Sequence, residues 1–251
     1  MRLDTLAAYL DQYLLITEEV ADPPEALNGL QVANAGDVTR LAAAVDLCAA
    51  TVRLAGAEGA DLLVVHHGLF WGGLRPLTGP FYDRVAGLLR SNIALYAAHL
   101  PLDRHPDVGN NSQLARLLGI TVRGEFGSYR GAPIGVWGER SGTREELGRA
   151  LEQALGGAAR LLPFGPERVQ RIGIVTGAGG SLIPQAAAAG LDTYITGEGQ
   201  HWTYFDAEEL RLNVFYAGHY ATETIGVKAL AAHISKKFDL PWVFLDHPTG
   251  L

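Results

Sequence analysis

The sequence predicts an α/β protein made of two similar α/β domains, and two observations carry that prediction. Short apolar runs typical of buried strands alternate along the 251 residues with stretches whose apolar residues recur at helical spacing. Such alternation favours sheets that are at least partly parallel. The second observation is an internal repeat, in which the same small motifs return in the same order in the second half of the chain.

The predicted elements follow one another in a regular order from the N-terminus. An amphipathic helix is predicted at the start, where one helical face collects the apolar residues Leu3, Leu6, Leu10, Tyr13 and Leu14. Residues 21–37 are rich in Pro, Asn and Gly and predict a loop. Strands are predicted at 41–45, 62–65, 93–97, 134–137, 172–176, 193–195, 214–216 and 242–245. Helices are predicted between them at 48–58, 80–91, 110–118, 144–155, 181–189 and 223–236.

Two of these helices carry signals at their ends. Thr143 and Glu146 stand three residues apart before an apolar run, which is a capping-box signature, and Gly156 ends the same helix. Asn110 and Asn111 are predicted to cap the helix that begins beside them.

The boundary between the halves is predicted in the segment with the least regular pattern, residues 123–131. We therefore expect a first α/β half at residues 1–125 and a second at residues 126–251.

The repeat aligns residues 59–71 with residues 190–202 without a gap. Its matched pairs are Gly59 and Gly190, Asp61 and Asp192, Gly68 and Gly199, and Trp71 and Trp202. The same offset pairs Arg40 with Arg171, and residues 96–103 align with residues 216–223 further along. We interpret this as a duplication, so that strand ends of the two halves would face each other across one cleft.

Composition excludes several classes of protein. Hydrophobic residues make up 48% of the chain, which excludes a disordered protein. The net charge of −7 argues against nucleic-acid and membrane partners, although a local basic patch stays open. The single cysteine, Cys48, excludes an internal disulfide and a thiolate metal cage. With no recognisable signal peptide or membrane span, we expect a cytoplasmic protein.

Two adjacent histidines are the first candidates for chemistry. His66 and His67 follow the apolar run 62–65, just past the predicted carboxyl end of a strand, where open α/β sheets place their ligand sites. Neighbouring side chains on an extended backbone point to opposite sides, so the pair can serve two metal ions. The alternative is a turn with two solvated histidines.

A histidine followed four residues later by a carboxylate occurs once in each half. His219 and Glu223 stand at the start of a predicted helix, where this spacing places both on one face; the alternative is a surface pair. Asp103 follows His99 by the same interval, but Pro101 predicts a loop there.

Imidazole and carboxylate ligands without sulfur favour Zn, Fe or Mn, and a carboxylate can bridge two divalent ions. Two such ions polarise a phosphoryl or carbonyl oxygen and lower the pKa of a bound water toward about 7, which favours a hydrolytic site. His99 and Glu198 are the candidate catalytic residues. Glu198 takes the place of the histidine pair in the repeat, where it would face the cleft as a support for a metal ligand or as a proton carrier, or else cap a turn.

The glycine-rich segment 176–181 lies between a predicted strand and a predicted helix. Its backbone N–H groups would suit a phosphate, but an ordinary tight turn is the alternative that we favour.

At these motifs the sequence resembles the Nif-three-like family of dinuclear metal-centre hexameric proteins, often called type 2 GTP cyclohydrolase I homologues. The motifs that carry the resemblance are Asn28–Gln31, Val65–Gly68, His99–Asp103, Gly109–Asn111, Thr196–Glu198 and Ala217–Glu223. The resemblance implies two similar α/β domains, a homohexamer and a dinuclear site.

The resemblance also implies a ligand set. His67 and Asp103 would hold one metal ion, His66 and His219 the other, and Glu223 would bridge both. Our first hypothesis is accordingly a metal-dependent hydrolase of a nucleotide or related phosphorylated compound, with GTP ring opening as one case. The alternative is a metal-binding or metal-handling scaffold without catalysis. A nucleic-acid partner is disfavoured by the acidic balance.

Overall fold

The computed structural model describes residues 1–16 and 22–250, which divide into two compact units. Unit 1 is Met1–Leu102 with Val227–His247, and unit 2 is Asp103–Gly226 with Pro248–Leu251. The chain thus passes from unit 1 to unit 2 at 102/103, whereas the irregular pattern of 123–131 led us to expect 125/126. The physical reason is strand pairing, because residues 121–129 join the sheet of unit 2 and residues 242–244 join the sheet of unit 1.

Unit 1 is built on a five-stranded sheet in the order β1-β4-β3-β2-β11. Its strands are β1 (Gly29–Val32), β2 (Leu41–Asp46), β3 (Leu62–His67), β4 (Ala94–Ala97) and β11 (Trp242–Phe244). Every neighbouring pair is parallel except β1 and β4, which are antiparallel. The carboxyl ends of β2, β3 and β4 therefore lie at one edge of the sheet.

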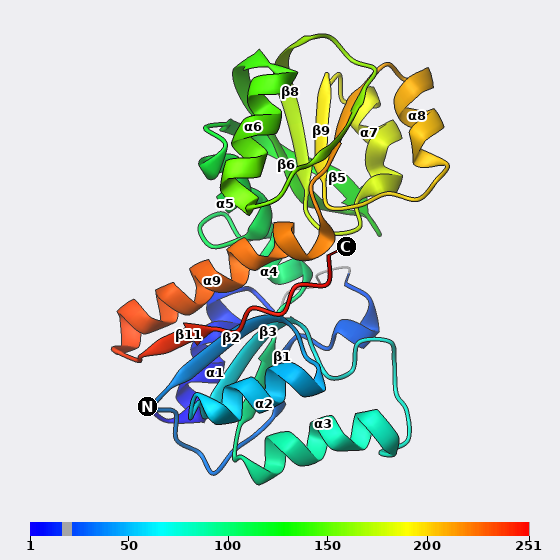
Figure 1. Cartoon of the computed structure of the whole chain (residues 1–251). Coiled ribbons are helices and arrows are strands. Elements are labelled where there is room, and N and C mark those ends of the chain that lie inside the picture. The colour runs from blue at the N-terminus through cyan, green and yellow to red at the C-terminus, as the bar shows by residue number, and fades with distance from the viewer. Residues whose placement is uncertain (17–21, 251) are drawn as a thin grey trace. The chain divides into compact units, whose positions relative to one another are not determined.

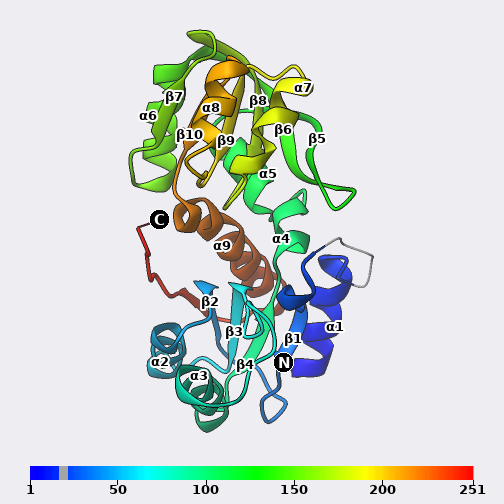
Figure 2. The same ribbon diagram turned by 90° about the vertical axis from the view of Figure 1, so that its right-hand side faces the viewer.

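Helices cover both faces of this sheet (Figure 1). The helices α2 (Ala49–Ala57) and α3 (Gly79–Arg90) pack on the face to which Leu63 and Val65 of β3 point. The other face carries α1 (Leu3–Tyr13), whose Asp11 accepts a 2.9 Å hydrogen bond from the Tyr96 hydroxyl of β4. The C-terminal part of α9 (His219–Phe238) packs beside α1 (Figure 2), with the His233 ring stacked 4.2 Å from that of Tyr13.

Unit 2 is built on a six-stranded sheet in the order β5-β6-β8-β9-β10-β7. Its strands are β5 (Thr121–Tyr129), β6 (Ala132–Thr143), β7 (Arg160–Pro163), β8 (Arg168–Val175), β9 (Thr193–Thr196) and β10 (Asn213–Tyr216). The central strands β8, β9 and β10 run parallel, and the other pairs are antiparallel.

The two faces of the second sheet are covered by different helices (Figure 1). One face carries α5 (Asn110–Leu117) and α6 (Arg144–Leu155), and the other carries the 3-10 turn η2 (Gly180–Leu182) with α7 (Ile183–Ala188) and α8 (Thr203–Glu209). Side chains of β10 alternate between them, because Phe215 packs in the α6 core while Val214 packs in the α8 core.

The two sheets confirm the predicted pair of similar α/β domains. Unit 1 has four adjacent parallel strands and unit 2 has three, and in each unit an antiparallel strand follows them at one edge of the sheet. Matched residues of the repeat also make equivalent hydrogen bonds in both units. The Asp61 carboxylate accepts the backbone N–H of Arg40, and the Asp192 carboxylate accepts that of Arg171.

Three local predictions are corrected by backbone pairing. Residues 123–131 are not irregular, because β5 pairs with β6 along its length despite its glycines. The loop predicted at 21–37 contains β1 and the 3-10 turn η1 (Pro24–Ala26). Pro101 does not prevent a helix, since α4 (Leu100–Arg104) has the proline in its first turn, where no N–H is needed.

The predicted capping box is confirmed, with the Thr143 side chain accepting from the Glu146 N–H and Gly156 ending α6 in the left-handed conformation. Among the described residues, no helix combines the length and the apolar character that crossing a membrane requires.

Candidate metal centre

Three histidines of unit 1 gather at the carboxyl edge of its sheet. His66 and His67 are the last two residues of β3, not the residues past its end, and His99 follows β4. Their ring centroids lie 4.8 Å apart for His66 and His67, 4.8 Å for His66 and His99, and 5.5 Å for His67 and His99. One ligand atom from each lies within 4.8 Å of the others, so the three side chains can hold a metal ion.

An acceptor fixes the orientation of each of these rings. His66 Nδ1 lies 2.9 Å from the Ala98 carbonyl oxygen, which can only accept, so Nδ1 carries the proton. His67 Nδ1 lies 2.8 Å from an Asp46 carboxylate oxygen, and His99 Nδ1 lies 2.6 Å from one of Asp22. A proton held at Nδ1 leaves the lone pair of a neutral imidazole on Nε2, which is the form that binds a metal.

The Asp22 carboxylate is the most fully satisfied of these acceptors. It also accepts from Asn28 Nδ2 at 2.7 Å and from the Leu100 N–H at 3.1 Å, while Asn28 Oδ1 accepts the His99 N–H at 2.7 Å. Burial on its own raises the pKa of Asp22, but the hydrogen bonds and charge of His99, with those of Asn28 and Leu100, outweigh it and lower the pKa. Asp22 is therefore ionised at neutral pH and holds the His99 ring in place through a charged acceptor.

An indole ring lies against the same histidines. The Trp71 ring centroid is 4.7 Å from that of His67 and 4.5 Å from that of His99. Its packing restricts both imidazoles on one side, while 39% of Trp71 stays exposed.

In unit 2, His219 and Glu223 stand one turn apart at the start of α9, as their spacing predicts. His219 Nε2 lies 3.1 Å from Glu223 Oε1, and His219 Nδ1 lies 2.9 Å from Glu198 Oε1. Glu223 is 3% exposed, so its carboxylate is almost entirely removed from water.

The two carboxylates control the charge of His219. Burial on its own lowers the pKa of His219, but the hydrogen bonds and charges of Glu223 and Glu198 outweigh it and raise the pKa to about 9. Without a metal ion, His219 is therefore a cation at neutral pH. A metal ion that binds there replaces its proton.

Asp103 belongs to unit 2 and is 6% exposed. One of its carboxylate oxygens, Oδ1, accepts from Asn110 Nδ2 at 2.8 Å and from Thr176 Oγ1 at 3.2 Å. Asn110 is not the predicted cap of α5, because Gly109 occupies that position, and its side chain reaches Asp103 and the Gly226 N–H instead. These neutral donors orient the Asp103 carboxylate without neutralising it.

The glycine-rich segment 176–181 is an ordinary turn whose N–H groups are largely used inside unit 2. The Thr176 N–H donates to the Asn111 side chain, and the Gly177 N–H donates to the Thr222 hydroxyl. The Gly179 N–H donates to the Thr196 hydroxyl, and the Gly180 N–H donates to the Glu198 carbonyl oxygen. The segment therefore lacks the row of available N–H groups that a phosphate needs.

Two residues that build the site, Asp46 and Asp22, were not predicted from the sequence. Asp46 could have been found from the sequence, because it ends the strand β2 and the parallel neighbour β3 ends in the two histidines. Asp22 could not, because it lies in an irregular segment and reaches His99 across 77 positions of sequence. His99, which we expected to be catalytic, lies among the histidines that can hold a metal ion.

The sequence matches the family described as Duf34/NIF3 (NGG1p interacting factor 3) over residues 1–249. A protein of Deinococcus radiodurans named "GTP cyclohydrolase 1 type 2 homolog" is 44% identical over 250 residues, covering 99% of this chain and 94% of that protein. A protein of Pyrococcus abyssi with the same name is 43% identical, with 100% of both chains covered.

Solved structures share the fold. TTHA1606 from Thermus thermophilus is 43% identical, with a TM-score of 0.91 and 100% of both chains covered. HcgD from Methanocaldococcus jannaschii is 27% identical, with a TM-score of 0.84 and 98% of both chains covered.

Proposed function

Because this chain belongs to the Duf34/NIF3 family, we propose that it is a dinuclear metal-dependent hydrolase acting on a nucleotide or a related phosphorylated compound. The two ions would be Zn, Fe or Mn, since the donors are imidazole and carboxylate groups without sulfur. The name of its relatives, GTP cyclohydrolase 1 type 2 homolog, supports a nucleotide-like substrate. The family resemblance supports a homohexamer.

The observation that carries the proposal is the way the imidazoles are held. Four histidines, His66, His67, His99 and His219, each place Nδ1 against a carbonyl or carboxylate oxygen at 2.6–2.9 Å. Partners of this kind fix the ring and its tautomer, and they leave Nε2 as the nitrogen that can bind an ion or exchange a proton. A surface histidine has no need for such support.

The ligand assignment that we propose follows the family resemblance. His67 and Asp103 would hold one ion, His66 and His219 would hold the other, and Glu223 would be shared by both. Such ions would polarise a phosphoryl or carbonyl oxygen and lower the pKa of a bound water.

His99 and Glu198 are the proton-handling groups in this proposal. Ionised Asp22 holds His99 Nδ1 at 2.6 Å, so it fixes the ring and leaves Nε2 as the nitrogen that would exchange a proton with a substrate. Glu198 holds His219 through a 2.9 Å contact, so it fixes the direction of His219 Nε2 and can exchange a proton with its ring.

The first expected result is a metal content of about two ions per chain, because five buried or half-buried donors are available for them. Elemental analysis of the natively purified protein measures it. Less than one ion per chain after reconstitution with Zn, Mn and Fe would refute the dinuclear site. A screen of nucleotides and phosphoesters then tests catalysis, and two tightly held ions without any turnover would favour the metal-handling alternative.

Gly177→Ala is expected to lower metal occupancy while unit 2 still folds. Gly177 has a φ of +67°, and a Cβ there would collide with the Glu223 carboxylate and lie 3.3 Å from His219 Nε2. Metal content per chain measures the effect. The matched control is Gly131→Ala, which has a similar positive φ of +87° but no atom within 4 Å of its Cβ. Equal occupancy in both variants would show that the space beside Glu223 is not needed.

A further inference from the structure

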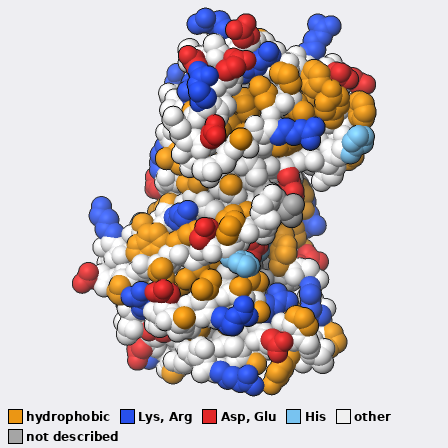
Figure 3. Space-filling model, in the orientation of Figure 1, with side chains coloured by type: hydrophobic (Ala, Val, Ile, Leu, Met, Phe, Trp, Pro, Cys, Tyr) orange, Lys and Arg blue, Asp and Glu red, His pale blue; other side chains and the backbone are white. Residues whose placement is uncertain are grey.

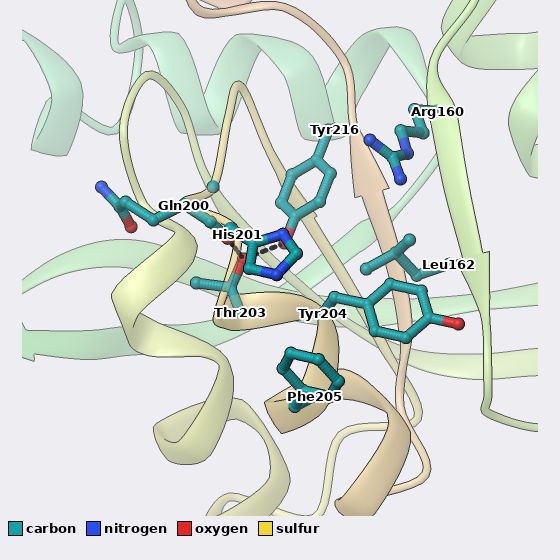
Figure 4. Close-up of a pocket in the computed structure, with 9 residues that line it drawn as sticks. Arg160, Leu162, Gln200, His201, Thr203, Tyr204, Phe205 and Tyr216 are labelled. Carbon is teal, nitrogen blue, oxygen red and sulfur yellow. Dashed lines mark hydrogen bonds between the residues drawn. The ribbon is translucent and has the colours of Figure 1, made fainter.

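A second site lies in unit 2, on the face of the sheet that carries α8. It is a pocket of about 340 Å³, within the range of roughly 300–1,000 Å³ that small ligands occupy. The side chains of Arg160 and Leu162 on β7 and of Tyr216 on β10 point into it, and residues 199–201 and 203–205 line the other side (Figure 4). All of its lining residues belong to one unit.

The floor of the pocket holds an ordered chain of hydroxyl groups. Thr203 Oγ1 lies 2.5 Å from the Gln200 carbonyl oxygen and 2.6 Å from the Tyr216 hydroxyl. Because Thr203 must give its one proton to the carbonyl, the Tyr216 hydroxyl donates to Thr203. The lone pairs of the Tyr216 oxygen are thereby presented as acceptors. Burial is the main cause that raises the pKa of Tyr216, so this hydroxyl stays neutral at neutral pH.

Gly199 lets the two hydroxyl groups pack against the main chain. A Cβ at this position would lie 2.6 Å from both Thr203 Oγ1 and the Tyr216 hydroxyl oxygen, which is closer than real Cβ contacts. Only glycine therefore allows the Thr203 and Tyr216 side chains to approach the main chain this closely and to meet each other there.

Arg160 supplies positive charge at the rim. Within the described part of the chain it has no carboxylate within salt-bridge distance, unlike Arg144, whose Nε lies 3.2 Å from Glu145 Oε1. Asp206 is the acidic group whose charge also acts on Tyr216, opposing the effect of Arg160. An anion is thus favoured on the Arg160 side of Tyr216.

Aromatic side chains surround the opening. His201 and Phe205 stand edge to face at 5.8 Å, and Tyr204 and Phe205 do so at 5.5 Å. Phe205 is 49% exposed and Tyr204 37% exposed. Hydrophobic side chains gather on this part of the surface, over α7 and α8 (Figure 3). Such rings favour a flat partner whose faces can stack.

We propose that this pocket binds a planar aromatic ring that carries an anionic group, with the ring among the aromatic side chains and the anion at Arg160. Ring N–H groups would donate to the Tyr216 oxygen. The pocket lies close along the chain to the proposed ligand His219 and its partner Glu198, because Gly199 directly follows Glu198 and Tyr216 precedes His219 by three residues. The inference rests on the proposed function only in the choice of GMP as the probe.

Isothermal titration calorimetry of the full chain tests the proposal with GMP, guanosine and inorganic phosphate. We expect GMP to bind at least about tenfold more tightly than guanosine or phosphate, because only GMP uses both parts of the pocket. Arg160→Gln should lower GMP affinity by about tenfold or more and leave guanosine affinity unchanged. Phe205→Ala should weaken both GMP and guanosine. Arg149→Gln is the matched control, since Arg149 is exposed on α6 over the opposite face of the sheet.

Several outcomes would overturn the proposal. One is that no binding of GMP is detected, and another is that Arg160→Gln binds GMP as the unaltered chain does. A third is that Arg160→Gln changes the mass measured by light scattering, which would make this surface an interface between copies. GMP binding that survives Glu223→Gln separates the pocket from phosphate binding at the metal ions. If Arg160→Gln keeps both its hydrolytic activity and its affinity for GMP, the proposed function stands but the pocket is not the GMP-binding site.

Discussion

Glu223→Gln is expected to lower the occupancy of both metal ions and to abolish hydrolysis while the fold stays intact. Of the five proposed ligands, only Asp103 and Glu223 bring negative charge, because the three imidazoles bind as neutral groups. Two dications held close together in a partly desolvated site repel each other strongly, and a bridging anion offsets that repulsion. Glu223 is 3% exposed, so solvent screens its charge little. Glutamine keeps the size and one oxygen but removes the charge.

Metal content and chelator titration of the purified variant measure this effect. The loss of affinity should exceed the roughly 10–100-fold that follows from removing a group which only supports a ligand. Glu152→Gln, at an exposed position of α6, is the matched control for the loss of one carboxylate. His66→Ala should mainly affect one ion. If Glu223→Gln retains two ions per chain with unchanged affinity, then Asp103 or a solvent-derived hydroxide is the bridge.

The repeated framework could be predicted because it rests on local patterns. Buried parallel strands appear as continuous apolar runs, and the matched positions Asp61 and Asp192 hold the neighbouring strands in the same way in both units. The strand β7 and the helix α8 could not be predicted. The four residues Arg160–Pro163 have no clear alternation, and α8 is short with several exposed aromatic residues. The pocket between them could therefore not be predicted from the sequence.

The site was predictable where residue type and spacing agree. His219 and Glu223 lie on one helical turn, so their 3.1 Å contact follows from the sequence pattern. Support from distant segments was not predictable. Asp22 reaches His99 from an irregular segment. Asn110, which the sequence predicts as a helix cap, instead reaches Asp103 from the first turn of α5. Such contacts depend on tertiary packing, which spacing along the chain does not report.

The Asn111 side chain makes three hydrogen bonds to the main chain inside unit 2. It is fully buried, and its amide nitrogen donates to the Asp103 carbonyl oxygen at 3.0 Å and to the Ile134 carbonyl oxygen at 2.8 Å. Its amide oxygen accepts the Thr176 N–H at 2.9 Å. One side chain thus joins α4, β6 and the turn after β8. The same turn continues into Gly177, which lies against Glu223.

Asn111→Leu is expected to lower the free energy of unfolding by about 3–4 kcal/mol, because leucine has the same number of side-chain heavy atoms but leaves three buried backbone groups without partners. Urea-induced unfolding of the metal-free protein, followed by circular dichroism, measures the loss. Gln153→Leu replaces an exposed amide on α6 and should change the free energy by no more than about 0.5 kcal/mol. Because Asn111 also fixes the main chain at Asp103 and Thr176, the variant should hold metal less tightly as well. A loss of stability no larger than that of the control would show that water or relaxed backbone replaces the three hydrogen bonds.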